Sequence, residues 1–156
     1  MTFQDFNFKD SLQNAINEAG FKEPSPIQSD AIPIVMAGKD MVGQAHTGTG
    51  KTAAFGLPIL NMMKDKKGVQ ALVIVPTREL AMQVADELYR FGKFLNINTA
   101  TVYGGQAYSR QLKQVEHAGI VVATPLISSS LKALKERLMA VVLSLPHTTS
   151  FAIKLS

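Results

Sequence analysis

The sequence contains no cysteine, and no stretch of it approaches the roughly 20 apolar residues that a membrane-spanning helix needs. Without cysteine there is no disulfide framework and no thiolate metal site, which is typical of a reducing compartment. No basic segment leads into an apolar run at the N-terminus, as a secretory signal would. We therefore expect a cytoplasmic protein that makes no contact with a membrane.

The positive charge of the chain is small and unevenly distributed. The 156 residues carry a net charge of +4 and are 46% apolar, which is enough for one hydrophobic core. Up to Pro125 there are 12 Lys or Arg and 11 Asp or Glu, whereas the 31 residues after Pro125 hold four basic residues and one acidic residue, Glu136. Because most of the excess lies in this tail, charge alone is a weak argument for nucleic-acid binding.

Strand and helix patterns alternate along most of the chain. Two helical patterns, over residues 9–20 and 25–38, come first. Short apolar runs follow at residues 40–45, 71–77, 97–105 and 119–125, and helical patterns separate them at residues 50–63, 78–92 and 106–119. This alternation predicts an α/β fold with a parallel sheet and helices on both faces.

A glycine-rich loop, "AHTGTGKT", lies between the first apolar run and the helical pattern after it. Its glycines allow a tight backbone whose N–H groups point at a phosphate, and the helix adds its positive end. Although Ala45 replaces the first glycine of the general pattern, the strand–loop–helix context favours a nucleotide site over an incidental turn. The predicted nucleotide-binding residues of this P-loop are Ala45, His46, Thr47, Gly48, Thr49, Gly50, Lys51 and Thr52. Lys51 would reach the outer phosphates and Thr52 would hold Mg²⁺, so these two are the predicted catalytic residues.

Other motifs before and after the P-loop indicate which family of nucleotide-binding proteins the sequence resembles. They are Phe3, "GFKEPSPIQ" at residues 20–28, "PTREL" at residues 76–80, "GG" at residues 104–105 and "ATP" at residues 123–125. In this order they resemble the N-terminal half of a DEAD-box RNA helicase, over about residues 3–125. The resemblance implies an incomplete RecA-like P-loop domain at residues 1–125, with its Q-motif region at residues 1–38. It also implies ATP and Mg²⁺ as cofactors, RNA as partner, and ATP-dependent RNA unwinding as the activity of the family.

The resemblance gives Phe21 and Gln28 roles in adenine binding. Phe21 would stack on the base with Phe3 behind it, and the Gln28 amide would both accept from and donate to the adenine edge. Each residue also has a simpler explanation. Gln28 stands three positions after Ser25, the spacing of a capping box, and Phe21 suits a hydrophobic plug.

The remaining family motifs point to an RNA site at the carboxyl end of the sheet, where such folds bind ligands. "PTREL" directly follows a predicted buried strand, and the resemblance implies that this loop grips the RNA backbone. A surface arginine is the simpler explanation for Arg78, but an arginine at a helix N-terminus opposes the helix dipole and needs another reason to be there. The predicted RNA-binding residues are Pro76, Thr77, Arg78, Gly104, Gly105 and Thr124.

After Pro125 the resemblance stops. Leu126 and Ile127 stand where the family has Gly-Arg, and no apolar strand is followed by Asp-Glu-Ala-Asp; the adjacent pair Asp86 and Glu87 lies inside a helical pattern. We therefore expect the chain to bind nucleotide without hydrolysing it, because phosphoryl transfer depends on positioning and electrostatic stabilisation. A binding module without turnover and a non-functional truncated product are the alternatives to an active enzyme.

Residues 126–156 are read as a tail foreign to the family. The spacing predicts one amphipathic helix from Ser128 to Leu145, ended by Pro146, beside a sheet that lacks its final strands. Its apolar face would comprise Leu131, Leu134, Leu138, Val141, Val142 and Leu145. Either a genuine replacement helix or translation in a shifted reading frame explains this tail, and the second is favoured.

Overall fold

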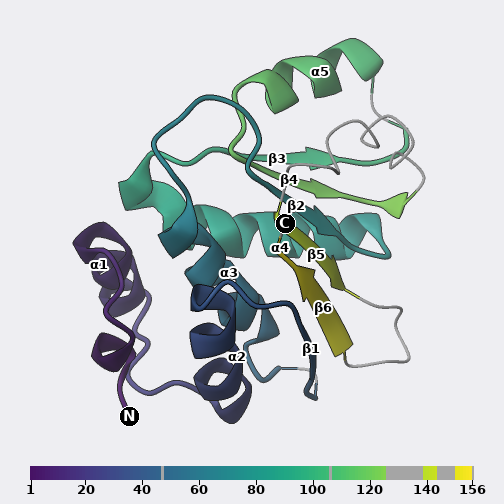
Figure 1. Cartoon of the computed structure of the whole chain (residues 1–156). Coiled ribbons are helices and arrows are strands. Elements are labelled where there is room, and N and C mark those ends of the chain that lie inside the picture. The colour runs from purple at the N-terminus through teal and green to yellow at the C-terminus, as the bar shows by residue number, and fades with distance from the viewer. Residues whose placement is uncertain (47, 106, 126–138, 144–149, 156) are drawn as a thin grey trace.

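The computed structural model describes residues 1–46, 48–105, 107–125, 139–143 and 150–155 (Figure 1). The first half begins with a 3-10 helix, η1 (Phe3–Phe6), and contains α1 (Asp10–Glu18), α2 (Pro26–Met36), β1 (Met41–Gln44), α3 (Lys51–Met62) and β2 (Ala71–Ile74). The second half contains α4 (Arg78–Gly92), η2 (Lys93–Leu95), β3 (Thr99–Val102), α5 (Tyr108–Glu116), β4 (Ile120–Ala123), β5 (Met139–Leu143) and β6 (Ser150–Lys154). The predicted alternation of strands and helices is confirmed up to β4.

The described strands form one sheet in the order β1-β6-β5-β2-β4-β3. β4 runs parallel to both β2 and β3, as predicted. β5, which was not predicted, also runs parallel to β2. β6 differs, because it pairs antiparallel with both β5 and β1. The sheet is therefore mixed, and the predicted parallel arrangement holds for every described strand except β6.

The tail supplies two strands, and this corrects the sequence-based prediction. The helix predicted from Ser128 to Leu145 is wrong at residues 139–143, which form β5; residues 126–138 and 144–149 lie outside the described residues. A short apolar run with β-branched residues suits a buried strand as well as a helix, and periodicity alone does not separate the two. The final strands were expected to be missing, yet β5 and β6 fill the sheet between β2 and β1.

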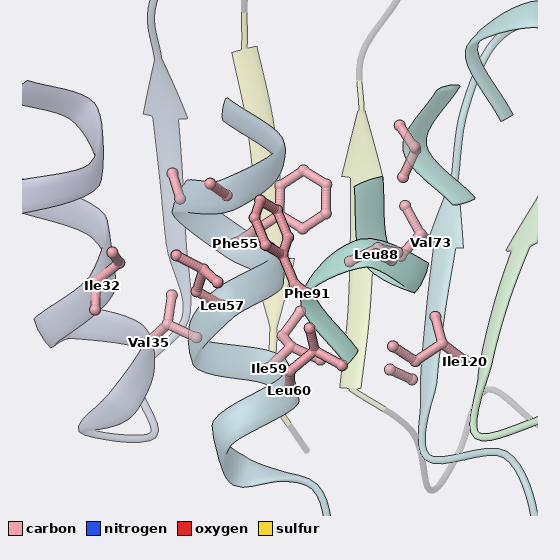
Figure 2. Packing of buried hydrophobic residues seen from close by; sticks show 14 of the residues in the cluster. Ile32, Val35, Phe55, Leu57, Ile59, Leu60, Val73, Leu88, Phe91 and Ile120 are labelled. Atoms are coloured by element: carbon pink, nitrogen blue, oxygen red, sulfur yellow. The ribbon is translucent and has the colours of Figure 1, made fainter. Parts of the chain in front are cut away.

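Helices cover both faces of the sheet, as predicted. Val73 of β2 and Ile120 of β4 point into a large core that helices α1 to α4 share. Their neighbours Leu72 and Val121 point to the opposite face, into a smaller cluster that Val115 of α5 joins. Figure 2 shows the large core, with labelled side chains from α2 (Ile32, Val35), α3 (Phe55, Leu57, Ile59, Leu60), α4 (Leu88, Phe91) and the strands (Val73, Ile120).

One aromatic residue of the tail lies deep in this core. Phe151 of β6 is 1% exposed, and its ring centroid is 6.0 Å from that of Phe55 on α3. The ring also covers Gly43 of β1, where an added Cβ would come within 2.5 Å of it. β6 therefore packs under α3, the helix that the P-loop opens. Among the described residues, no helix has the length and hydropathy that crossing a membrane requires.

Candidate functional site

The P-loop leads from β1 to the N-terminus of α3, as its pattern predicts. Gly48 and Gly50 both have φ near +80°, a left-handed conformation that favours glycine. Gly50 caps α3 and Lys51 is its first residue, so the loop presents the positive end of the helix dipole. The two glycines therefore allow the tight backbone that the pattern predicts, and phosphate binding by the loop stays a prediction; Thr47 lies outside the described residues.

Two hydrogen bonds between described residues close the loop. Lys51 Nζ donates to the carbonyl oxygen of Ala45 at 3.0 Å, and Thr49 Oγ1 donates to that of His46 at 2.6 Å. The lysine ammonium therefore spans the loop from its last residues to its first. A phosphate would compete well for this ammonium, because hydrogen bonds between two charged groups are stronger than those to a neutral carbonyl.

Gln28 ties the start of α2 to the P-loop, and its side chain is only 3% exposed. Its Oε1 accepts from the Ser25 backbone N–H at 2.9 Å, and its Nε2 donates to the Gly50 carbonyl at 3.1 Å. Ser25 Oγ adds a bond to the carbonyl of Thr49 at 2.8 Å. The capping interpretation of Gln28 is thus confirmed, whereas the bonds to the P-loop were not predicted. With respect to the described residues, each end of the amide has one further bonding position, so adenine recognition stays a prediction that the capping role does not exclude.

Gln28→Glu separates these roles. Glutamate caps α2 as well as glutamine does, but it donates neither to Gly50 nor to a base. We expect the variant to stay folded and to lose its preference for ADP over GDP, measured as the difference between the melting-temperature shifts that the two nucleotides cause. Ser25→Ala is the matched control, since it removes a bond to the P-loop and leaves the amide in place. If Gln28→Glu keeps the adenine preference, Gln28 serves the structure alone.

Phe21 belongs to an aromatic group that includes the N-terminal segment. Its half-buried ring lies edge-on to that of Phe3, with centroids 5.7 Å apart, and is tilted against Phe91 of α4 at 5.6 Å. Phe3 therefore braces Phe21, as the resemblance implies. The plug interpretation fits the same contacts, so stacking of Phe21 on adenine stays a prediction.

The predicted RNA-binding loops share one end of the sheet. β4 lies between β2 and β3 and all three run parallel, so the loops that follow them leave at the same edge (Figure 1). Val75 N donates to the Ala123 carbonyl at 2.9 Å, and Thr124 N donates to the Val102 carbonyl at 3.1 Å. The structure thus brings together residues 76–78, 104–105 and 124 from distant parts of the chain.

Arg78 crosses this edge to an aromatic residue that sequence reasoning missed. Thr77 caps α4 by accepting from Leu80 N at 3.2 Å, which leaves Arg78 as the first residue of the helix. The guanidinium carbon of Arg78 lies over the Tyr103 ring, 4.7 Å from its centroid. The signal in the sequence was an aromatic residue directly before the Gly104-Gly105 pair, at the end of a predicted strand.

The adjacent acidic pair of the sequence, Asp86 and Glu87, lies inside α4 as expected. Burial raises the pKa of Glu87, and the Coulombic attraction of Arg90 only partly opposes this. Among the described residues, no three His, Cys, Asp or Glu side chains gather in a way that could hold a metal ion. Thr52 stays the contact for Mg²⁺ that the P-loop pattern predicts, and the described residues place no acidic cluster beside it.

Comparison with known proteins gives concordant matches in sequence. Residues 25–145 match the family model "DEAD/DEAH box helicase". The chain is 49% identical over 125 residues to the DEAD-box ATP-dependent RNA helicase RhpA of Helicobacter pylori (strain B128), covering 80% of this chain and 25% of the relative. It is 50% identical over 127 residues to the ATP-dependent RNA helicase CshA of Limosilactobacillus reuteri, covering 80% and 26%. The chain thus spans about a quarter of the length of these curated relatives.

Solved structures agree with the sequence matches. A DEAD box protein from the hyperthermophile Methanococcus jannaschii superposes with a TM-score of 0.77 at 37% identity, over 85% of this chain and 38% of that protein. A hypothetical ATP-dependent RNA helicase from Sulfolobus tokodaii gives a TM-score of 0.73 at 41% identity, over 81% and 37%. Both matches confirm the predicted RecA-like α/β class. The family match also runs past Pro125 to residue 145, further than the sequence motifs indicated.

Proposed function

Because the chain belongs to the DEAD/DEAH box helicase family, we propose that it is a nucleotide- and RNA-binding part of an ATP-dependent RNA helicase. Residues 1–125 would supply the contacts of a partial N-terminal RecA-like domain, with residues 1–38 as its Q-motif region. The observation that carries the proposal is the P-loop with two left-handed glycines, held against α2 by Gln28. On its own, this chain is proposed to bind ATP without turning it over.

The residues around the P-loop fit an adenine nucleotide with Mg²⁺. Lys51 would transfer its ammonium from the Ala45 carbonyl to the phosphates, and the N–H groups at the start of α3 would face the same charge. Thr52 would be the one contact from the P-loop to Mg²⁺, an ion that usually keeps several waters and binds few protein ligands. When bound, Mg²⁺ neutralises phosphate charge, while Phe21 and Gln28 would orient the adenine.

RNA would bind at the edge where the loops after β2, β4 and β3 meet. The residues proposed to contact the sugar-phosphate strand are Pro76, Thr77, Arg78, Gly104, Gly105 and Thr124, and the proposal is supported by the common edge of the sheet at which they lie. Contacts to the backbone of a strand read charge and shape rather than base sequence. We therefore propose single-stranded or duplex RNA as the partner, bound without strong sequence preference.

Lys51→Ala is expected to remove most of the stabilisation that Mg-ADP gives the chain. A ligand at 100 times its dissociation constant adds about 2.7 kcal/mol to the free energy of unfolding. In a domain of this size that is several degrees, at roughly 2–4 °C or more per kcal/mol. The measurement is the melting temperature with and without Mg-ADP. Lys66→Ala is the matched control, because Lys66 lies in the loop before β2, towards the opposite end of the sheet. An unchanged response in Lys51→Ala would refute the P-loop assignment.

A further inference from the structure

The Arg78–Tyr103 contact bridges two strands that are not neighbours. Arg78 begins the helix after β2 and Tyr103 follows β3, while β4 lies between these strands. Adjacent strands are about 4.8 Å apart, so β2 and β3 are separated by roughly twice that distance. Only long side chains cross such a gap, and the guanidinium of Arg78 reaches the ring of Tyr103 over the end of β4. Thr124, which is 8% exposed, follows β4 at that point.

The Tyr103 side of the bridge is anchored from α5. Gln111, which is 8% exposed, donates from Nε2 to the backbone carbonyl of Tyr103 at 2.7 Å. The N–H of Thr124 bonds to the carbonyl of Val102, the residue before Tyr103. One bond from a side chain and one from the backbone of the neighbouring strand end therefore fix the segment that carries the ring. Arg78 itself is exposed at the N-terminus of a helix, where the helix dipole repels its charge.

Building on the RNA-binding function proposed above, we propose that Tyr103 is a positioning residue that holds Arg78 for an RNA phosphate. A guanidinium is attracted to the face of an aromatic ring, and its N–H donors lie in its own plane. A guanidinium held over the ring therefore keeps N–H groups for an oxyanion above the end of β4. The ring also offsets the unfavourable helix dipole and reduces the side-chain freedom that Arg78 would lose on binding.

The test is binding of a fluorescent single-stranded oligouridine to the full chain at low salt. We expect Tyr103→Leu to weaken binding about fivefold, which corresponds to roughly 1 kcal/mol. Tyr103→Phe, which keeps the aromatic face, should bind almost like the unmodified chain. Tyr103→Leu should also lower the salt dependence of binding by about 0.7 in the log–log slope, the value for one phosphate contact on a single strand. A purely structural role would not produce that change in slope.

A double-mutant cycle completes the test. In an Arg78→Ala background, Tyr103→Leu should have no further effect on affinity, because the ring acts through the arginine. If Tyr103→Leu weakens binding equally in both backgrounds, the ring contacts RNA directly, for example by stacking on a base, and the inference is wrong. Should Tyr103→Leu fail to fold, Tyr103→Met in the same cycle gives the same decision. If Arg78→Ala binds RNA normally, the proposed RNA site itself fails. If Arg78→Ala weakens binding and Tyr103→Leu does not, only the positioning role fails.

Discussion

Phe151→Ala is expected to lower the free energy of unfolding by about 3–5 kcal/mol, the usual cost of removing a buried phenylalanine. Phe151 packs against Phe55 of α3 and over Gly43 of β1, so its loss leaves a cavity between the P-loop strand and the P-loop helix. Domains of this kind have only about 5–15 kcal/mol of stability in total. The variant should therefore melt far below the unmodified chain and aggregate more readily.

Chemical denaturation followed by circular dichroism measures this loss. Lys154→Ala is the matched control, because Lys154 is an exposed residue of the same strand. In this variant the free energy of unfolding should change by no more than about 0.5 kcal/mol. If Phe151→Ala is as stable as the control, the tail takes no part in the core. That result would favour a shifted reading frame as the origin of residues 126–156, whereas a large loss favours a genuine replacement.

The fold before Pro125 could be predicted from the sequence because its signals are local. A glycine loop between an apolar run and a helix, and a threonine cap at the start of α4, each depend on residues close together in the chain. The tail could not be predicted in this way. Whether residues 139–143 form a helix or a strand depends on β2 and β6 beside them, and an isolated apolar run carries no information about its neighbours. The antiparallel direction of β6 likewise depends on the strands beside it, β5 and β1, and so could not be predicted from its own residues.

In the candidate site, too, the features with local signals could be predicted, and the contacts between distant residues could not. The P-loop and "PTREL" were identified from their own residues, and Gln28 was predicted to cap α2 from its distance to Ser25. The bond from Gln28 to Gly50 joins residues 22 positions apart, and the contact between Arg78 and Tyr103 joins the start of α4 to the loop after β3. Such contacts follow from strand order, and a sequence gives the order of strands along the chain but not their order in the sheet. Gln111 was also missed, because nothing in the helical pattern of α5 indicates that its side chain reaches back to the Tyr103 carbonyl.

The sheet bears directly on whether the chain hydrolyses ATP. β5 is the next described strand after β4 in the chain, and it lies parallel to β2, beside the strand that leads to "PTREL". The resemblance implies a buried strand at this point in the chain order, with Asp-Glu-Ala-Asp at its end. In this sequence the residues after β5 are Ser144, Leu145 and Pro146. We propose that β5 replaces that strand without its acidic end.

The chain is therefore expected to release no phosphate from ATP above background, with or without single-stranded RNA. A P-loop lysine and a threonine-held Mg²⁺ stabilise the ground state and the transition state alike, and uniform binding of this kind leaves the barrier almost unchanged. A carboxylate that accepts the proton of the attacking water contributes about 10²–10⁴ in rate, and an arginine finger about 10³–10⁵ more. In this sequence no Asp-Glu-Ala-Asp motif follows Pro125 to supply such a carboxylate.

Phosphate release by the purified chain, with and without oligouridine, tests this expectation, and Lys51→Ala subtracts contaminating ATPases. Binding is checked on the same preparation by the melting-temperature shift with Mg-ADP, so that inactivity is not confused with misfolding. A chain that is stabilised by Mg-ADP and releases no phosphate is a binding module, because its P-loop holds the nucleotide while no Asp-Glu-Ala-Asp motif follows Pro125 to act in the transition state. RNA-stimulated release that disappears in Lys51→Ala would overturn the proposal. It would mean that residues after Pro125, or a second copy of the chain, supply a carboxylate or a cation to the transition state.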